Sequence, residues 1–286
     1  MNLLKSVFIS GYMMLLVGGS LYGGWQVWLT TYQPIGWGLI LTTLPMMMQF
    51  SWLMLAKSQA RTSRHFLRIQ LLSFTGLMIV LFSMTTHPNG LLCAAIATGA
   101  FVGLLLYVYW YSSLKSSNSA VVQLGQPLPP IELVGHHGLV NFNQTFGDAP
   151  VIMLFFRGNW CPLCMAQLKE LAEQYQLLQK LGVRVALISP QSHDNTRALA
   201  EKLKVAFEFY ADPSNKAAEK LGLAHPNGLP MGMQILGYDS DTVLPTVLIL
   251  APDGKVVWQH QTDNYRIRPE PEVFIGALRE LGLITQ

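Results

Sequence analysis

The first 115 residues consist of long apolar runs separated by short polar breaks. Each run is close to the ~20 residues that a helix needs to cross the hydrocarbon core of a bilayer. The first run is longer than the ~7–15 apolar residues of a signal sequence, and three more follow it. Buried helices of a soluble domain would show polar faces. The pattern therefore predicts a bundle of four transmembrane helices over residues 7–29, 35–55, 67–86 and 91–111.

Small residues inside these runs indicate close helix packing. The pairs Gly19-x-x-x-Gly23 and Gly99-x-x-x-Gly103 have the spacing that lets two helices approach each other, and we expect them to pack the bundle. Cys93 lies in the fourth run. A lone cysteine cannot form a dithiol, so we interpret it as a small packing residue.

Basic residues of this half fall on one side of the predicted bundle. Residues 1–120 contain no Asp or Glu, and their Lys and Arg residues precede the first span, lie between the second and third spans or at the start of the third (Arg68), or follow the fourth. Basic loops stay preferentially in the cytoplasm. We therefore expect everything after residue 115 to be cytoplasmic. The net charge of +3 averages two unlike halves and does not indicate nucleic-acid binding, which needs a concentrated basic face.

The second half alternates between strand-like and helix-like segments. Short apolar runs predict strands at residues 151–156, 183–188, 207–210, 243–250 and 255–261. Stripes with helical spacing predict helices up to about residue 180, over 194–204 and 215–221, and near the C-terminus. This order predicts an α/β domain with a central mixed sheet and helices on both faces. The predicted organisation is a transmembrane domain over 1–115, a linker over 116–124 and the α/β domain over 125–286.

Two of the three cysteines, Cys161 and Cys164, lie where a buried strand gives way to a helix. Free N–H groups and the helix dipole stabilise an anion at that position, so we expect Cys161 to be an exposed thiol with a lowered pKa. Cys164, one turn further along, would be shielded and able to attack a mixed disulfide. A structural disulfide, a zinc site and an inert pair remain alternatives, although a cytoplasmic location disfavours the first and the absence of a second C-x-x-C the second.

Five segments of this half carry recognisable patterns. They are LGQPLPPIELVGHHGLVNF (124–142), VIMLFFRGNWCPLC (151–164), Leu244-Pro245-Thr246, PDGKVV (252–257) and NYRIRPEPEVFIGAL (264–278). Together they resemble the thioredoxin superfamily and, within it, the alkyl hydroperoxide reductase/thiol-specific antioxidant family, in particular its peroxiredoxin-like bacterial members. The resemblance implies a thioredoxin-like fold for residues 125–286, and we recognise nothing as specific in the four-span part.

The resemblance also implies roles for individual residues. Cys161 would be the attacking thiol and Cys164 the resolving thiol. Pro245, in a cis peptide bond, would face the dithiol and hold a substrate strand. The residues that would support the dithiol or position the substrate are Trp160, Pro245, Thr246 and Arg157. Either Arg266 or Arg268 could also support a thiolate. No metal and no cofactor are implied beyond the redox-active dithiol itself.

These features together predict a membrane-anchored thiol oxidoreductase. Its partners would be the lipid bilayer, an external dithiol donor (thioredoxin-like or glutathione) and a peroxide or disulfide substrate. We expect a multi-pass protein of a bacterial inner membrane, with the redox domain on the cytoplasmic side.

The sequence departs from the family in one respect that bears on the substrate. A peroxiredoxin carries Pro-x-x-x-Thr/Ser-x-x-Cys, but counting back from Cys161 gives Gly158 and Leu154, and counting back from Cys164 gives Cys161 and Arg157. The hydroxyl that activates a peroxide is thus missing in both registers. Slow hydroperoxide reduction is therefore the first hypothesis and disulfide reduction the second. A redox sensor and a non-catalytic scaffold remain as alternatives.

Overall fold

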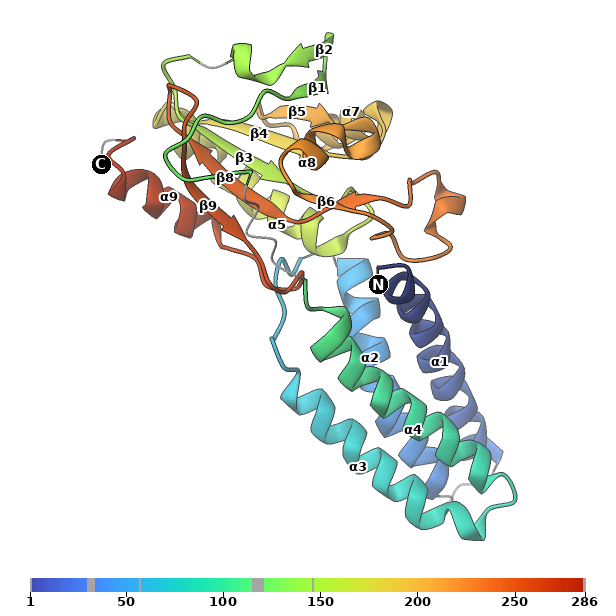
Figure 1. Ribbon diagram of the computed structural model, residues 1–286. Coiled ribbons are helices and arrows are strands. Elements are labelled where there is room, and N and C mark those ends of the chain that lie inside the picture. Colours follow the sequence, from blue (N-terminus) through green and yellow to red (C-terminus); the bar gives the residue numbers. More distant parts are fainter. Residues whose placement is uncertain (1, 30–33, 57, 115–120, 146, 285–286) are drawn as a thin grey trace. The chain divides into compact units, whose positions relative to one another are not determined.

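The computed structural model describes residues 2–29, 34–56, 58–114, 121–145 and 147–284 (Figure 1). The chain divides into two units. The first holds residues 3–56 and 63–113, and the second holds most of the remainder, from residue 114 onward. Residues 58–62, which the sequence analysis placed with the transmembrane domain, belong to the second unit. Residues 116–120 of the predicted linker lie outside the described residues.

The first unit consists of long apolar helices where the sequence predicts them. They are α1 (Asn2–Leu29), α2 (Pro34–Ala56), α3 (Leu67–Ser83) with the short η1 (Met84–Thr86), and α4 (Gly90–Leu106) with the π-helical η2 (Tyr107–Tyr111). By length and composition, four segments could cross a membrane: 2–29, 34–56, 67–86 and 90–111.

Glycines pack these helices closely, as predicted. A Cβ atom at Gly19 would lie 2.8 Å from Thr43 Cγ2, and one at Gly103 would lie 2.5 Å from the ring of Tyr12. Small residues therefore allow α1 to approach both α2 and α4.

The second unit is built on a seven-stranded mixed sheet of order β2-β1-β5-β4-β3-β8-β9. β3 and β5 are parallel to β4, which lies between them, whereas β8 is antiparallel to both β3 and β9. The strand bounds are β1 (Glu132–Gly135), β2 (Gly138–Asn141), β3 (Val151–Phe155), β4 (Arg184–Ser189), β5 (Glu208–Ala211), β8 (Thr246–Leu250) and β9 (Val256–Gln261). A separate pair joins β6 (Ala224–His225) and β7 (Thr242–Val243).

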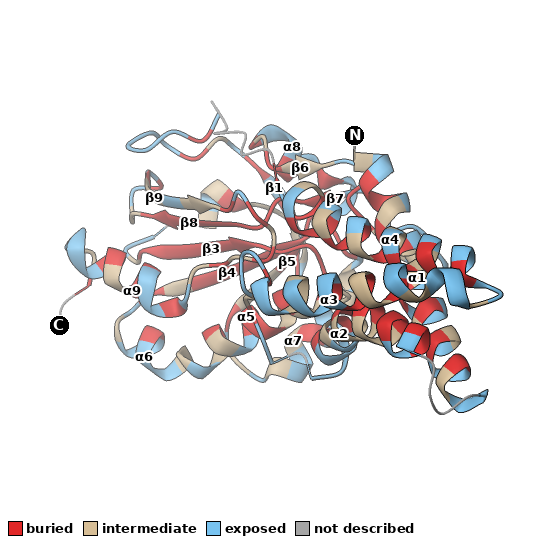
Figure 2. Cartoon of the chain, turned by 90° about the horizontal axis from the view of Figure 1, so that it is seen from below, coloured by how far each residue is buried: buried red, intermediate tan, exposed pale blue. Residues whose placement is uncertain are grey.

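Helices cover both faces of this sheet. They are α5 (Pro162–Glu173), α6 (Tyr175–Lys180), α7 (His193–Leu203), α8 (Lys216–Lys220) and α9 (Pro271–Glu280), with short 3₁₀ turns η3 (Phe142–Thr145), η4 (Pro213–Asn215) and η5 (Met233–Leu236). Figure 2 shows α8 on the opposite side of the sheet from α5 and α6. Every residue of β3 is buried, which explains why this strand is a continuous apolar run rather than an alternating one. The predicted architecture is therefore confirmed.

One predicted strand is interrupted. The run 243–250 forms β7 and β8, which are separated by Leu244 and Pro245. The Leu244 N–H donates to Leu223 O (2.8 Å), outside the main sheet. Among the described residues no peptide bond is cis. The Leu244–Pro245 bond is thus trans, and the prediction of a cis bond is wrong.

Candidate active site

The dithiol lies at the junction of β3 and α5. Cys161 is the N-cap of α5, with extended backbone angles (φ −84°, ψ 108°), and its sulfur accepts a hydrogen bond from the Cys164 N–H at 3.4 Å. Pro162 begins the helix, where its missing N–H leaves no intrahelical bond unmade. Both cysteines are free thiols. Cys161 is only 2% exposed and Cys164 is fully buried, so the expected exposed thiol is not found.

A buried arginine contacts both sulfurs. Arg268, in the segment between β9 and α9, places Nη2 3.5 Å from Cys164 Sγ and 3.8 Å from Cys161 Sγ. Its Nη1 donates to Gln167 Oε1 at 3.1 Å. In the described part of the chain Arg268 has no carboxylate partner. A buried guanidinium without a carboxylate favours negative charge on the neighbouring sulfurs.

The surroundings of the two thiols favour this charge on Cys164, whereas the sequence-based prediction placed it on Cys161. Burial raises the pKa of Cys164, but the hydrogen bond from Cys161, the charge of Arg268 and the Arg157 backbone together lower it to about 6. Burial also raises the pKa of Cys161, and its hydrogen bond to Cys164 and the charge there raise it further, well above its usual value. The direction of the Cys161 pKa shift is therefore opposite to the prediction, because burial disfavours a thiolate on Cys161 and its hydrogen bond to Cys164 disfavours it further.

Arg157 and Trp160 pack against each other in the loop between β3 and α5. The Arg157 guanidinium lies over the rings of Trp160 (4.9 Å) and Tyr265 (5.6 Å) and donates to Gly228 O. Trp160 Nε1 donates to Arg157 O at 3.1 Å. Gly158 makes this packing possible, since its φ is +136° and a Cβ there would lie 2.7 Å from Trp160 Nε1. Arg157 thus supports the loop through cation–π contacts.

Pro245 and Thr246 lie on the Arg268 side of the site. Both line a small cavity together with Gln167, Arg268 and Pro269. Thr246 is the first residue of β8 and pairs with Phe155, the last residue of β3. Pro245 thus lines the same cavity as Arg268, which contacts the dithiol, although neither cysteine lines it.

Several polar residues of the site were not singled out from the sequence. Gln191 Oε1 accepts a hydrogen bond from the Asn159 N–H (2.8 Å), and Tyr238 O–H donates to Asn159 Oδ1 (2.6 Å). Gln167, three residues after Cys164, could have been inferred from helix periodicity, because i and i+3 positions share a face. No periodicity in the sequence connects Gln191 or Tyr238 with the cysteines.

The described residues offer no group of three or more His, Cys, Asp or Glu side chains that could hold a metal ion. The chemistry available to the site is that of a low-pKa thiolate, a second thiol and a guanidinium.

Comparison with known proteins finds a family that part of this unit resembles. Residues 124–259 match the AhpC/TSA family. This part of the chain, just under half of it, is similar to that family and is called the AhpC/TSA domain here for that similarity. The match begins in the opening segment of the unit and ends within β9, so it covers Cys161, Cys164 and Pro245, whereas Arg268 lies beyond it.

Curated relatives of the AhpC/TSA domain include peroxiredoxins. The chain is 28% identical over 142 residues to a 1-Cys peroxiredoxin PER1 of Triticum aestivum, covering 46% of this chain and 61% of the relative. It is 29% identical over 109 residues to a chloroplastic peroxiredoxin Q of Sedum lineare, covering 38% of this chain and 59% of the relative. The chain thus spans about three fifths of the length of these relatives.

Among solved structures, reduced Prx3 from Vibrio vulnificus is similar at 18% identity and a TM-score of 0.49, over 55% of this chain and 99% of that one. Peroxiredoxin 6 of Arenicola marina is similar at 17% identity and a TM-score of 0.49, over 56% and 74%.

Proposed function

We propose that the chain is a membrane-anchored thiol peroxidase that uses Cys164 as the attacking thiolate and Cys161 as the resolving thiol. The observation that carries this proposal is the buried Arg268 guanidinium 3.5 Å from Cys164 Sγ, together with a Cys164 pKa of about 6. At neutral pH the pair then holds one proton, on Cys161. Peroxide-reducing relatives of the AhpC/TSA domain agree with this chemistry.

The reaction needs no group beyond the dithiol, a peroxide and a reductant. The Cys164 thiolate attacks one peroxide oxygen, so that an S–O bond forms and the O–O bond breaks. The leaving oxygen departs as hydroxide or alkoxide and takes up a proton. Cys164 is then a sulfenic acid, and attack by the Cys161 sulfur forms the disulfide and releases water. An external dithiol reduces this disulfide and is itself oxidised.

The missing hydroxyl of the family pattern has a counterpart in this register. When Cys164 is counted as the reactive cysteine, Cys161 stands where the pattern has Thr or Ser. The Cys161 thiol is a donor to the Cys164 sulfur, since this hydrogen bond lowers the pKa of Cys164 and raises that of Cys161. A thiol is a weaker donor than a hydroxyl, so we expect peroxide reduction to be slow.

The site of action follows from the first unit. We propose that its four apolar helices cross a bacterial inner membrane, with the AhpC/TSA domain on the cytoplasmic side. The positions of the basic residues support this orientation. A reducing cytoplasm would supply a thioredoxin-like or glutathione donor.

The decisive experiment separates the two thiols in the purified full chain. Cys161→Ser keeps a hydroxyl donor beside Cys164, so it should retain a single turnover with hydrogen peroxide and accumulate a Cys164 sulfenic acid. Multiple turnovers with a dithiol donor should be lost. Cys164→Ser should lose the single turnover as well, and Cys93→Ala should behave as the unmodified chain. A Cys161→Ser variant that no longer reacts, beside a Cys164→Ser variant that does, would reverse the assignment.

Disulfide reduction is the second candidate. It is favoured by the C-x-x-C spacing at a helix N-terminus, with Cys161 as the less buried of the two sulfurs. Rapid reduction of insulin disulfides without any consumption of hydrogen peroxide or organic hydroperoxides would establish this function in place of the first.

A further inference from the structure

A short segment between α2 and α3 forms part of the AhpC/TSA-bearing unit. This segment, residues 58–62, is named the strap here. Ala60 is buried to 1% exposure. The Thr62 N–H donates to Arg266 O (3.1 Å), and Arg61 Nε donates to Arg268 O (3.2 Å). Neighbouring strap residues therefore bind alternate carbonyl groups of the segment that carries Arg268.

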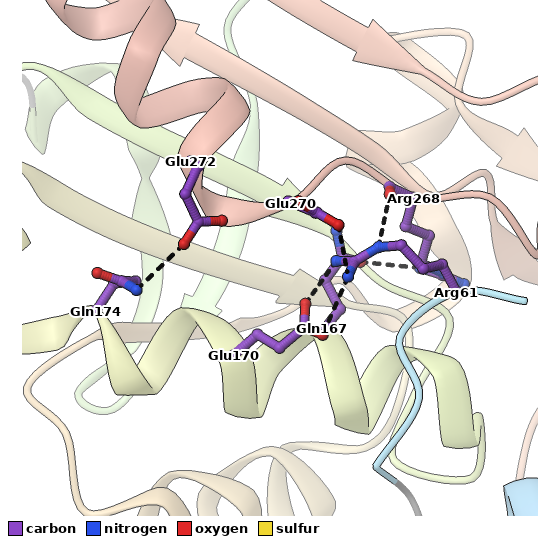
Figure 3. Close-up of polar contacts among 7 residues, drawn as sticks. All are labelled: Arg61, Gln167, Glu170, Gln174, Arg268, Glu270 and Glu272. Atoms are coloured by element: carbon purple, nitrogen blue, oxygen red, sulfur yellow. Dashed lines mark hydrogen bonds and ion pairs between the residues drawn. The ribbon is translucent and has the colours of Figure 1, made fainter.

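The Arg61 side chain joins this segment to α5. Its guanidinium binds Glu170 with two nitrogens, Nη1 to Oε1 at 3.2 Å and Nη2 to Oε2 at 2.6 Å. Nη1 also lies 3.3 Å from Glu270 Oε1, just before α9 (Figure 3). Two-point binding of a carboxylate fixes the orientation of both groups. Arg61 thus connects α5, through Glu170, with the segment before α9, through Arg268 O and Glu270.

The contact continues along one face of α5 toward the dithiol. Cys164, Gln167 and Glu170 follow each other at intervals of three residues and so lie on one side of the helix. Figure 3 shows Arg268 directed to Gln167 and Arg61 directed to Glu170. Cys164 and Gln167 are held by Arg268, and Glu170 by Arg61. Arg61 and Arg268 therefore both connect α5 with the segment before α9. The contacts of Arg61, which lie farther from the dithiol, restrain those of Arg268.

The contacts of Arg268 with the dithiol depend on this restraint by Arg61. Arg268 is 3% exposed, its Nε atom has no hydrogen-bond partner, and its bonds are to an amide and two sulfurs. Each of these partners contacts a single guanidinium nitrogen, so none fixes the orientation of Arg268 as a carboxylate bound at two points would. Without the strap, Arg268 could turn toward solvent or toward Glu270, since a buried charge gains free energy from either change.

We propose that the strap, and Arg61 above all, is a positioning element of the dithiol: it keeps Arg268 on the two sulfurs by fixing the Arg266–Arg268 backbone against α5. Arg61 touches neither sulfur, so it acts through Arg268. The proposal deepens the proposed function, because it identifies residues encoded between two predicted membrane spans as a determinant of thiolate reactivity.

The test measures the thiolate directly in the purified full chain. The ultraviolet absorbance of the thiolate is followed against pH, together with the rate of alkylation of Cys164. Arg61→Ala should raise the apparent pKa of the thiolate by about one unit, which lowers alkylation about tenfold at pH values below that pKa. Arg61→Lys keeps the charge but not the two-point contact, so it should give an intermediate shift. Arg197→Ala removes an exposed arginine paired with Asp194 and should cause none.

A second variant, Glu170→Gln, tests the same contact in case Arg61→Ala does not fold. Glu170→Gln keeps the size of the side chain but weakens the contact with Arg61, and it should shift the pKa of the thiolate in the same direction. A thiolate pKa in Arg61→Ala or Glu170→Gln that equals that of the Arg197→Ala control, in a folded protein, would overturn the proposal. The measurement does not require peroxide turnover. A chain that reduces no peroxide but shows the pKa shift would contradict the proposed function and leave this inference standing.

Discussion

Replacing Arg268 by methionine tests the electrostatic basis of the site. Methionine keeps an unbranched stem but removes the charge. At an effective dielectric constant of about 20, two unit charges 3.5 Å apart attract each other by about 5 kcal/mol. At 1.36 kcal/mol for each pKa unit, this sets an upper limit of about 3 to 4 units for the shift. Water that enters the vacated space would return part of the lost solvation, and opposite charges at such distances usually shift a pKa by about 1–3 units.

We therefore expect Arg268→Met to raise the pKa of Cys164 by about two units, from about 6. The sign follows from the thiolate, because losing a cation destabilises the charged form. At pH 7 the thiolate fraction would fall from about nine tenths to about one tenth. The rate of alkylation of Cys164 at pH 7, assigned by mass spectrometry, should fall in proportion.

Two further variants make the result specific. Arg268→Lys keeps a cation near the sulfurs and should shift the pKa of Cys164 less than methionine does. Arg279→Met removes an exposed arginine of α9 and should leave the profile unchanged. If Arg268→Met alkylates with the same midpoint as the unmodified chain, then the hydrogen bond from Cys161 and the end of α5 are sufficient to stabilise the thiolate, and the role assigned to Arg268 is refuted.

Two other predictions concern the loop and the topology. Gly158→Ala places a Cβ 2.7 Å from Trp160 Nε1 at a φ of +136°, and should lower the stability of the folded domain by about 2 kcal/mol; Gly147→Ala, which meets no atom within 4 Å, is the matched control in thermal unfolding, and equal midpoints would contradict the close-packing argument. Alkaline phosphatase fused after Gln286 should be inactive in a bacterial host, because the basic residues predict a cytoplasmic C-terminus; strong phosphatase activity would instead place the dithiol outside the cytoplasm.

Local patterns in the sequence were sufficient for the elements of this protein. The apolar runs predicted the four long helices to within a few residues, because a helix of that length and composition needs no partner to be recognised. The buried strand β3 and the cysteines that follow it were located in the same way. Their position at a strand-to-helix junction depends only on residues 151–164, which are contiguous in the chain.

The properties of the two thiols depended on the tertiary structure. The helix N-terminus alone would favour a thiolate on Cys161, the N-cap residue, and the sequence analysis predicted this. The fold adds Arg268, 104 residues from Cys164, and places it 3.5 Å from Cys164 and 3.8 Å from Cys161. Burial raises the pKa of both thiols, and the hydrogen bond from Cys161 together with the charge of Arg268 then lowers that of Cys164.

The strap was still harder to foresee. Arg61 lies 109 residues from Glu170 and 207 residues from Arg268, in a loop whose basic residues the sequence analysis interpreted only as a signal for membrane orientation. No local periodicity connects residues so far apart. Ion pairs and hydrogen bonds of this kind require α5 and the segment before α9 to be adjacent in the folded domain. The sequence therefore determined where the thiols lie, and the tertiary structure decided which charged groups surround them.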